Sequence, residues 1–289
     1  MNFKNLGDLS KRIRISSILI LLVATLLTFY DYLPITIALV LLVACAAAIA
    51  VWEYAKLAVA KKFHPSVKTM IFFAVMEVFA FFAAHKNVVI SEFPALVLVV
   101  GAITFFIAHF KGTSEALANI AIEFFGVCYV SVPLSCFLGI LYPIAQHEHT
   151  QDGRWWFVYL IISTKIVDIC GYFVGKLWGK RKLAPVLSPK KTVEGALAGF
   201  VGAILVSVAF SGFGKKMAPD SFHLPIFEAL ALGALIGILA QIGDLAESLL
   251  KRDAGVKDSN VLSGPGGALD MLDSLLLTTP IVYFYLKIV

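Results

Sequence analysis

Long apolar runs separated by short polar intervals are the dominant pattern of this chain. The runs lack the alternation of apolar and polar residues that is typical of a membrane β-strand, and most could cross a hydrocarbon core of about 30 Å as a helix. Lipid offers no hydrogen-bond partner to the backbone, so spans of this kind must be helical. The pattern therefore predicts an all-α integral membrane protein, a polytopic helical bundle.

Hydropathy predicts about nine transmembrane helices, the first of them an uncleaved N-terminal span. They are expected near residues 15–32, 34–58, 67–84, 92–110, 116–144, 155–178, 193–213, 226–249 and 267–288. Pro133 lies inside the long fifth run and is expected to bend or break that helix. We expect one membrane domain over 1–289, with N-terminal spans in 1–150 and the spans that carry the chemistry in 155–289.

Composition agrees with a membrane location and narrows the classes of partner. The chain is 60% hydrophobic and 15% charged, and its mean hydropathy is +0.88. The net charge of +5 is modest, so nucleic acid is not an expected partner. The four cysteines lie in apolar runs without a CxxC or Cys/His spacing, which predicts neither a disulfide framework nor a zinc site.

Lys and Arg are unevenly distributed between the two sides that nine helices would define. Most fall in the N-terminal segment and in the intervals that follow even-numbered spans, including the charge-rich intervals 179–192 and 250–267. The positive-inside rule then places the N-terminus and both charge-rich loops in the cytoplasm and the C-terminus outside. An error of one span between the two loops would separate them.

Carboxylates occur in the last two spans, where lipid penalises them. Asp244, Ser248 and Lys251 are spaced i, i+4 and i+7 on one helix face, and Asp270 and Asp273 are spaced i and i+3 on the next helix. Ionisable groups in a span are expected to be functional. Three carboxylates from two helix ends suit a hard divalent cation such as Mg²⁺. The alternative, in which the last two acids only cap a helix, leaves Asp244 unexplained.

The interval "LSPKKTVEG" is a candidate phosphate site. Ser188 and Pro189 form a favourable N-cap and first-turn pair, which would place Lys190 and Lys191 in the first turn of the seventh helix. Cations there oppose the helix dipole, and a bound phosphate would reverse that penalty. The alternative is that these lysines only set topology. In the sixth span, Asp168 either pairs with Lys165 or points into the site while the lysine meets a lipid phosphate.

Two motifs resemble a known family. "SLLKRDAGVKDS" followed by "GGALDMLD" resembles the C-terminal signature of phosphatidate cytidylyltransferases, also called CDP-diacylglycerol synthases. "DICGYFVGKLWGKRKLAPVLSPKKTVEG" is similar to the sixth-to-seventh-span region of that family, and "WEYAKL" at 52–57 looks like its early Glu-aromatic segment. Pro265 and Met271 stand where the family usually has His and Arg, so the acid–base or phosphate role of those positions is left open.

The resemblance implies condensation of CTP with phosphatidate to CDP-diacylglycerol and pyrophosphate, in phospholipid biosynthesis at the cell inner membrane. It implies Mg²⁺ held by Asp244, Asp270 and Asp273, with room for a second cation. The expected catalytic residues are these three aspartates and Lys257. The expected substrate-binding residues are Ser188, Lys190, Lys191, Thr192, Glu194, Ser248, Lys251, Arg252 and Asp168. The expected partners are CTP, phosphatidate and the bilayer, with a homodimer as an option.

Two alternative functions stay open at this point. One is a CTP-using enzyme with another lipid phosphate or a polyprenol as acceptor. The other is a cation-coupled transporter, in which Lys165, Asp168, Asp244 and a broken fifth span would form an ion pathway.

Overall fold

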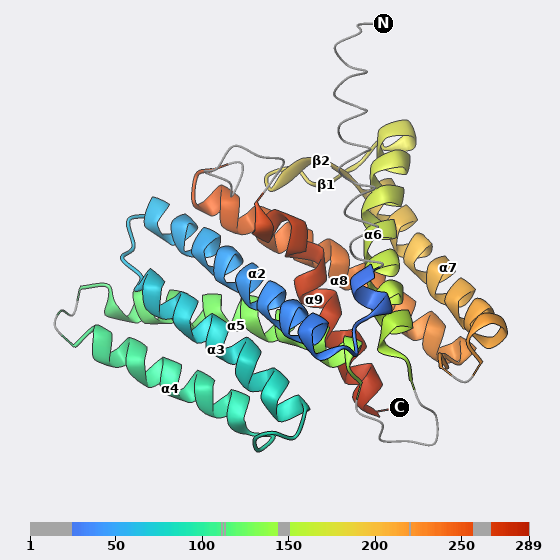
Figure 1. Cartoon of the computed structure of the whole chain (residues 1–289). Coiled ribbons are helices and arrows are strands. Elements are labelled where there is room, and N and C mark those ends of the chain that lie inside the picture. The colour runs from blue at the N-terminus through green and yellow to red at the C-terminus, as the bar shows by residue number, and fades with distance from the viewer. Residues whose placement is uncertain are drawn as a thin grey trace, which may run out of the picture. The chain divides into compact units, whose positions relative to one another are not determined.

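A computed structural model describes residues 25–110, 112, 114–143, 151–219, 221–256 and 267–288 (Figure 1). These residues form helices and one antiparallel hairpin. The helices are α2 (Leu33–Ala60), α3 (Val67–His85), α4 (Phe93–Ala108), α5 (Ala116–Leu141), α6 (Gly153–Trp178), α7 (Val193–Met217), α8 (Ile226–Asp253) and α9 (Ala268–Ile288). The hairpin consists of β1 (Lys182–Ala184) and β2 (Ser188–Thr192).

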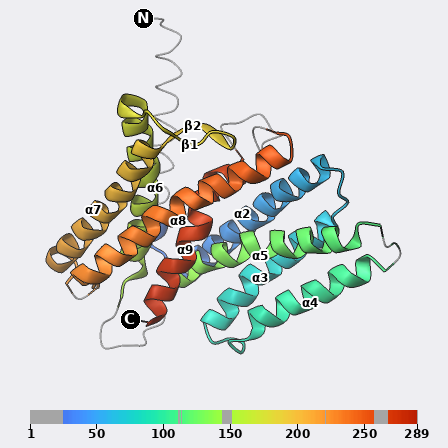
Figure 2. The same cartoon turned by 180° about the vertical axis from the view of Figure 1, so that it is seen from behind.

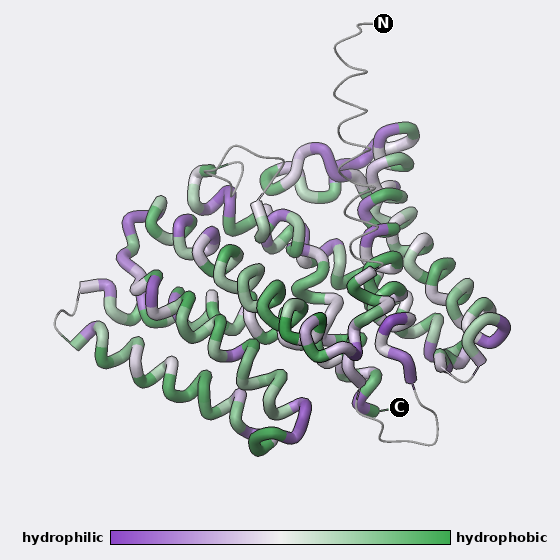
Figure 3. The backbone as a smooth tube through the Cα atoms, viewed as in Figure 1, coloured by the Kyte–Doolittle hydropathy of each residue, from purple (hydrophilic) through white to green (hydrophobic). Residues whose placement is uncertain are grey.

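Seven of the described helices are long and apolar enough to cross a membrane. Most residues within the helices are apolar, and hydrophilic residues are concentrated at helix ends and in the hairpin (Figure 3). The prediction of a multi-pass, all-α membrane protein is therefore confirmed. Helix α4 is apolar but has only 16 residues, and residues 15–24 of the first predicted span lie outside the described residues. The number nine therefore stays a prediction.

The chain divides into two compact units, residues 1–42 and 43–289. In the described part of the first unit, the Thr36 hydroxyl donates to the backbone carbonyl of Tyr30 at 2.9 Å. In the second unit, α3 packs against α4 and α5, and α6, α7, α8 and α9 pack as successive neighbours. Helix α5 also packs against α9 and so joins the two groups (Figures 1 and 2).

Small residues allow the helices of the second unit to approach closely where polar groups lie. A Cβ atom at Gly195 of α7 would lie 2.5 Å from the carbonyl oxygen of Gly171 on α6. A Cβ atom at Gly243 of α8 would lie 2.5 Å from the carbonyl oxygen of Asp273 on α9. Helix association in lipid depends on such close packing, because no hydrophobic driving force acts between apolar surfaces there. These glycines therefore set the spacing between the helices that carry the charged side chains.

The predicted start of the seventh helix at Ser188 is wrong. Residues 188–192 form strand β2, and α7 begins at Val193 with Thr192 as its N-cap. The Thr192 hydroxyl oxygen accepts the backbone N–H of Gly195 at 3.2 Å. A start at this position places Glu194 in the first turn, where an acid complements the helix dipole. The two lysines that would have opposed the dipole lie in the strand instead.

The predicted break at Pro133 is also absent. Helix α5 runs as one helix from Ala116 to Leu141 with the proline inside it. Prolines are tolerated in membrane helices because neighbouring helices and side chains compensate for the lost backbone hydrogen bond. In the most apolar stretch of α5, 72% of the residues are buried, so this helix has such neighbours on most sides. The transporter alternative therefore loses the broken helix on which it partly depended.

The contact of α8 with α9 at Gly243 gives a testable prediction. Replacing Gly243 by Ala should lower the midpoint of thermal unfolding in detergent, because the new methyl group would meet the backbone of Asp273. The control is Gly212→Ala in α7, where a Cβ atom meets nothing within 4 Å. That variant should equal or exceed the wild type, since alanine favours a helix over glycine. Equal midpoints for the two variants would contradict the assigned packing.

Candidate functional site

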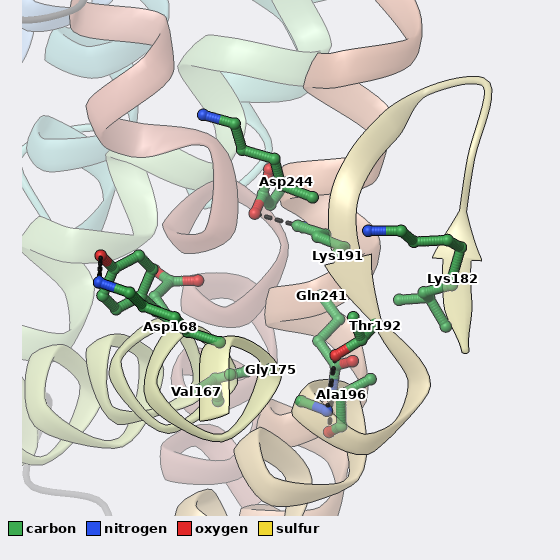
Figure 4. Close-up of a pocket in the computed structure, with 15 residues that line it drawn as sticks. Val167, Asp168, Gly175, Lys182, Lys191, Thr192, Ala196, Gln241 and Asp244 are labelled. Carbon is green, nitrogen blue, oxygen red and sulfur yellow. Dashed lines mark hydrogen bonds and ion pairs between the residues drawn. The ribbon is translucent and has the colours of Figure 1, made fainter. Parts of the chain in front are cut away.

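A pocket of about 550 Å³ lies between α6, the hairpin, α7 and α8 (Figure 4). Its charged lining consists of four lysines and two aspartates from these elements: Lys176, Lys182, Lys190, Lys191, Asp168 and Asp244. Tyr172, Thr192 and Gln241 contribute uncharged polar groups. A pocket with an excess of ammonium groups favours a polyanionic ligand.

The acids of the pocket already have cationic partners. Lys191 of the hairpin forms an ion pair with Asp244 of α8, drawn as a dashed line in Figure 4. The Lys165 ammonium lies 3.7 Å from the Asp168 carboxylate and 3.4 Å from the carbonyl oxygen of Met271 on α9. Asp168 therefore lines the pocket and also forms the predicted ion pair with Lys165, while a contact of Lys165 with a lipid phosphate stays a prediction.

Two contacts anchor the hairpin beside the pocket. The Glu194 carboxylate accepts the backbone N–H groups of Lys180 at 3.0 Å and Arg181 at 3.2 Å. Arg252, near the end of α8, donates its Nε–H to the carbonyl oxygen of Leu187 at 3.2 Å. The hairpin and the end of α8 thus lie at the same end of the bundle. The prediction that the two charge-rich intervals share one side agrees with this contact.

A second charged cluster joins α8 to α9. The Lys251 ammonium lies 2.6 Å from carboxylate oxygens of both Glu247 and Asp270. Glu247 is only 1% exposed, and its Oε1 atom has no hydrogen-bond partner among the described residues. The other oxygen of Asp270 accepts the backbone N–H of Gly267 at 3.0 Å. Buried charges need such pairing, because removing one partner would leave an uncompensated charge in the interior.

Asp273 lies at the contact of α8 with α9, where its backbone meets Gly243. It is 9% exposed, and Gly243, where a Cβ atom would lie 2.5 Å from the Asp273 carbonyl oxygen, directly precedes Asp244. Asp168 and Asp244 line the same pocket. A cation among these acids would be favoured by their charge. Within the described residues, however, no group of three or more His, Cys, Asp or Glu side chains is already gathered around a metal position.

The structure sorts the predicted site residues into groups. Five line the pocket or its wall: Asp168, Lys190, Lys191, Thr192 and Asp244. Lys251 and Asp270 belong to the second cluster, and the backbone of Asp273 lies against Gly243 of α8. Glu194 and Arg252 contact the backbone of the hairpin region. Ser188 begins β2, Ser248 lies in α8, and Lys257 lies outside the described residues.

Sequence reasoning missed three polar residues that contribute to this arrangement. Glu247 precedes Lys251 by four residues in α8, and this i, i+4 spacing of an acid and a base in a span was a usable signal. Glu53 of α2 is 4% exposed and contacts the start of α9. Gln241 donates to the carbonyl oxygens of Ala196 at 3.1 Å and Gly237 at 2.7 Å. Its helical spacing alone gave no indication of that role.

Comparisons with known proteins identify the family of the chain. A model of the cytidylyltransferase family matches residues 10–289. A phosphatidate cytidylyltransferase of Chlamydia pneumoniae is 36% identical over 288 residues, which cover 98% of this chain and 93% of the relative. One from Chlamydia trachomatis is 46% identical over 172 residues, 60% of this chain and 56% of the relative. One from Synechocystis is 30% identical over 256 residues, 81% of this chain and 83% of the relative.

The anchoring of the hairpin by Arg252 gives a testable prediction. In the Arg252→Ala variant, backbone amides of residues 182–192 should exchange hydrogen for deuterium faster, because the hairpin loses the Arg252 contact with α8 and keeps only the described ion pair of Lys191 with Asp244. Mass spectrometry of the protein in detergent measures this exchange. Lys216→Ala, in the last turn of α7, is the control and should leave the hairpin unchanged. Equal exchange in both variants would show that Arg252 does not hold the hairpin.

Proposed function

Because the chain belongs to the cytidylyltransferase family, we propose that it transfers the cytidylyl group of CTP to phosphatidate and releases pyrophosphate. The product, CDP-diacylglycerol, stays in the membrane. The observation that carries the proposal is the family match over residues 10–289, together with a relative named for this activity that aligns over nearly the whole chain. The protein is thus a membrane-embedded nucleotidyltransferase of phospholipid synthesis, as the sequence predicted. The other acceptors and the transporter are not favoured.

The lysine-rich pocket is the proposed site of the CTP triphosphate. Lys182, Lys190 and Lys191 face it from the hairpin and would neutralise the phosphate groups and stabilise the departing pyrophosphate. The phosphate oxygen of phosphatidate attacks the α-phosphorus of CTP in line. The bond from that phosphorus to the bridging oxygen breaks, and pyrophosphate leaves with the electron pair. Phosphatidate is already ionised, so no general base is required.

The acids at the α8–α9 contact are the proposed holders of Mg²⁺. Carboxylate oxygens are the ligands that Mg²⁺ prefers, and Asp244 directly follows Gly243, which meets the backbone of Asp273 at this contact. Together with Asp270, these two aspartates form the predicted ligand set, and a second cation can share it. When bound, the metal would neutralise charge on the transferring phosphate.

The remaining predicted residues take supporting roles in this proposal. Glu194 and Arg252 keep the hairpin in place through its backbone. Lys251 places Asp270 through a direct ion pair, and Asp168 adds negative charge to the pocket wall. Substrate binding stays the proposed role of Ser188, Thr192 and Ser248. Lys257 stays a proposed catalytic residue.

We further propose a single membrane domain of nine spans in a cell inner membrane. The N-terminus, the hairpin and the end of α8 face the cytoplasm, where CTP is available, and the C-terminus lies outside. The excess of Lys and Arg near the hairpin supports this orientation. The end of α9 also lies at the opposite end of the bundle from the hairpin (Figure 1). A homodimer stays a prediction.

The activity itself is tested on the purified full chain in mixed detergent and lipid micelles. We expect pyrophosphate release that requires CTP, phosphatidate and Mg²⁺ together, with CDP-diacylglycerol detected by mass spectrometry. Chelation by EDTA should stop the release. If the wild type releases no pyrophosphate under these conditions, the proposed function is wrong.

The assigned acids are tested by neutral, nearly isosteric variants. Asp244→Asn and Asp270→Asn should each lower kcat by about 100-fold or more, because a charge placed at the reacting phosphate is lost. The control is Asp253→Asn, near the end of α8, whose side chain is 63% exposed and pairs with Lys61. It should retain wild-type kcat. If Asp270→Asn also retains it while the wild type is active, the site is misassigned although the function stands.

A further inference from the structure

We propose that Glu53 of α2 is a positioning residue for the reaction: it holds the N-terminus of α9 and thereby sets the place of Asp270 and Asp273. The inference rests on the proposed function, because it assumes that these two aspartates serve the transfer. It adds a residue from the N-terminal part of the chain, more than 200 positions before the acids that it serves.

The contact is made by both oxygens of the Glu53 carboxylate. Oε1 accepts the backbone N–H of Ala268 at 3.1 Å, and Oε2 accepts that of Leu269 at 2.8 Å. The first N–H groups of a helix have no partner within the helix, and they form the positive end of its dipole. A carboxylate that binds two of them is therefore held firmly and holds the helix start in return.

The same helix start includes one of the site acids. Asp270 accepts the backbone N–H of Gly267 through one oxygen and binds Lys251 through the other. Three consecutive N–H groups, of residues 267 to 269, are thus bound by two carboxylates from different helices. Leu269, the last residue of this group, is fully buried. Any displacement of this turn would move Asp270 directly.

Asp273 depends on the same turn because it follows Asp270 by three residues on the same helix face. Its backbone also lies against Gly243 of α8. The start of α9 is therefore fixed from two directions, by α2 through Glu53 and by α8 through Lys251 and Gly243. A displacement of about 1 Å can cost about 100-fold in rate when it moves groups at a reacting centre.

A helix start does not require a distant carboxylate. A local Ser, Thr, Asp or Asn provides an ordinary N-cap at lower cost, whereas Glu53 is a carboxylate that is only 4% exposed. Burying a charge is expensive even when it is paired. In return, Glu53 links α2 rigidly to α9, the helix that carries Asp270 and Asp273. Such a link suits a reaction that requires these acids at fixed positions.

The test compares Glu53→Gln with the wild type by steady-state kinetics and by hydrogen–deuterium exchange in detergent. The amide keeps the size of the side chain but loses the charge and one acceptor. We expect kcat to fall about 10-fold to 100-fold and the Mg²⁺ concentration for half-maximal rate to rise. The KM for CTP should change little, because the lysine-rich pocket is lined by α6, the hairpin, α7 and α8. The amides of Ala268 and Leu269 should exchange faster.

The matched control is Glu77→Gln in α3, another carboxylate that is almost fully buried. It should leave exchange at Ala268 and Leu269, and the Mg²⁺ dependence, as in the wild type. If Glu53→Gln does not fold, Glu53→Asp replaces it, since the shorter carboxylate keeps the charge and should give a smaller change of the same kind.

The outcomes are separable. Faster exchange at Ala268 and Leu269 with a lower kcat and an unchanged KM supports the proposal. Faster exchange with wild-type kcat and Mg²⁺ dependence reduces Glu53 to a structural cap and overturns it, and so does unchanged exchange. A wild type that makes no pyrophosphate defeats the proposed function, while the exchange measurement still reports whether Glu53 holds α9.

Discussion

The cost of placing charge inside a lipid-embedded helical bundle governs how this site is built. An isolated carboxylate or ammonium group there would be strongly disfavoured. The described site residues meet this constraint by pairing: Lys191 with Asp244, and Lys251 with Glu247 and Asp270. The pair of Lys191 with Asp244 joins the hairpin to α8, and the pair of Lys251 with Asp270 joins α8 to α9. The interactions that make these charges tolerable therefore also fix the three elements relative to one another.

The close approach of neighbouring helix backbones makes this pairing geometrically feasible. Lys251 and Asp270 meet across two helices, α8 and α9, whose backbones approach closely at Gly243. The hairpin has a complementary role. As the chain leaves α6, the hairpin carries Lys190 and Lys191 to the pocket, where Lys191 pairs with Asp244 of α8. Neither lysine occupies a helix start, where its charge would be unfavourable.

Much of the fold could be predicted from the sequence. A membrane-spanning helix depends on the hydropathy of about twenty consecutive residues, which is a local property. The bounds predicted for α8 and α9 lie within a few residues of Ile226–Asp253 and Ala268–Ile288. The hairpin was not predicted, because its strands are short and depend on Glu194 and on Arg252, 65 positions from Leu187. Propensity at Ser188 suggested a helix, and tertiary contacts decided otherwise.

The candidate site shows the same division. The residue types and their helical spacing indicated which side chains belong to it, including Asp168, Asp244 and Lys191, which meet at one pocket. The partner of each charge could not be predicted, because pairing depends on the distance between helices. Glu53 and Glu247 illustrate this. The segment "WEYAKL" and the i, i+4 spacing with Lys251 singled out their surroundings, but which groups they bind follows only from the contacts with α9, direct or through Lys251.

The ion pair between Lys191 and Asp244 has a consequence for the order in which ligands arrive. As long as the pair persists, the lysine is not free for a phosphate and the aspartate is not free for a metal. A cation that reached Asp244 would release Lys191, and a phosphate that reached Lys191 would release Asp244. By thermodynamic linkage, each ligand would then strengthen the binding of the other by the same factor. A nucleotide already complexed with its metal would meet both demands in one encounter.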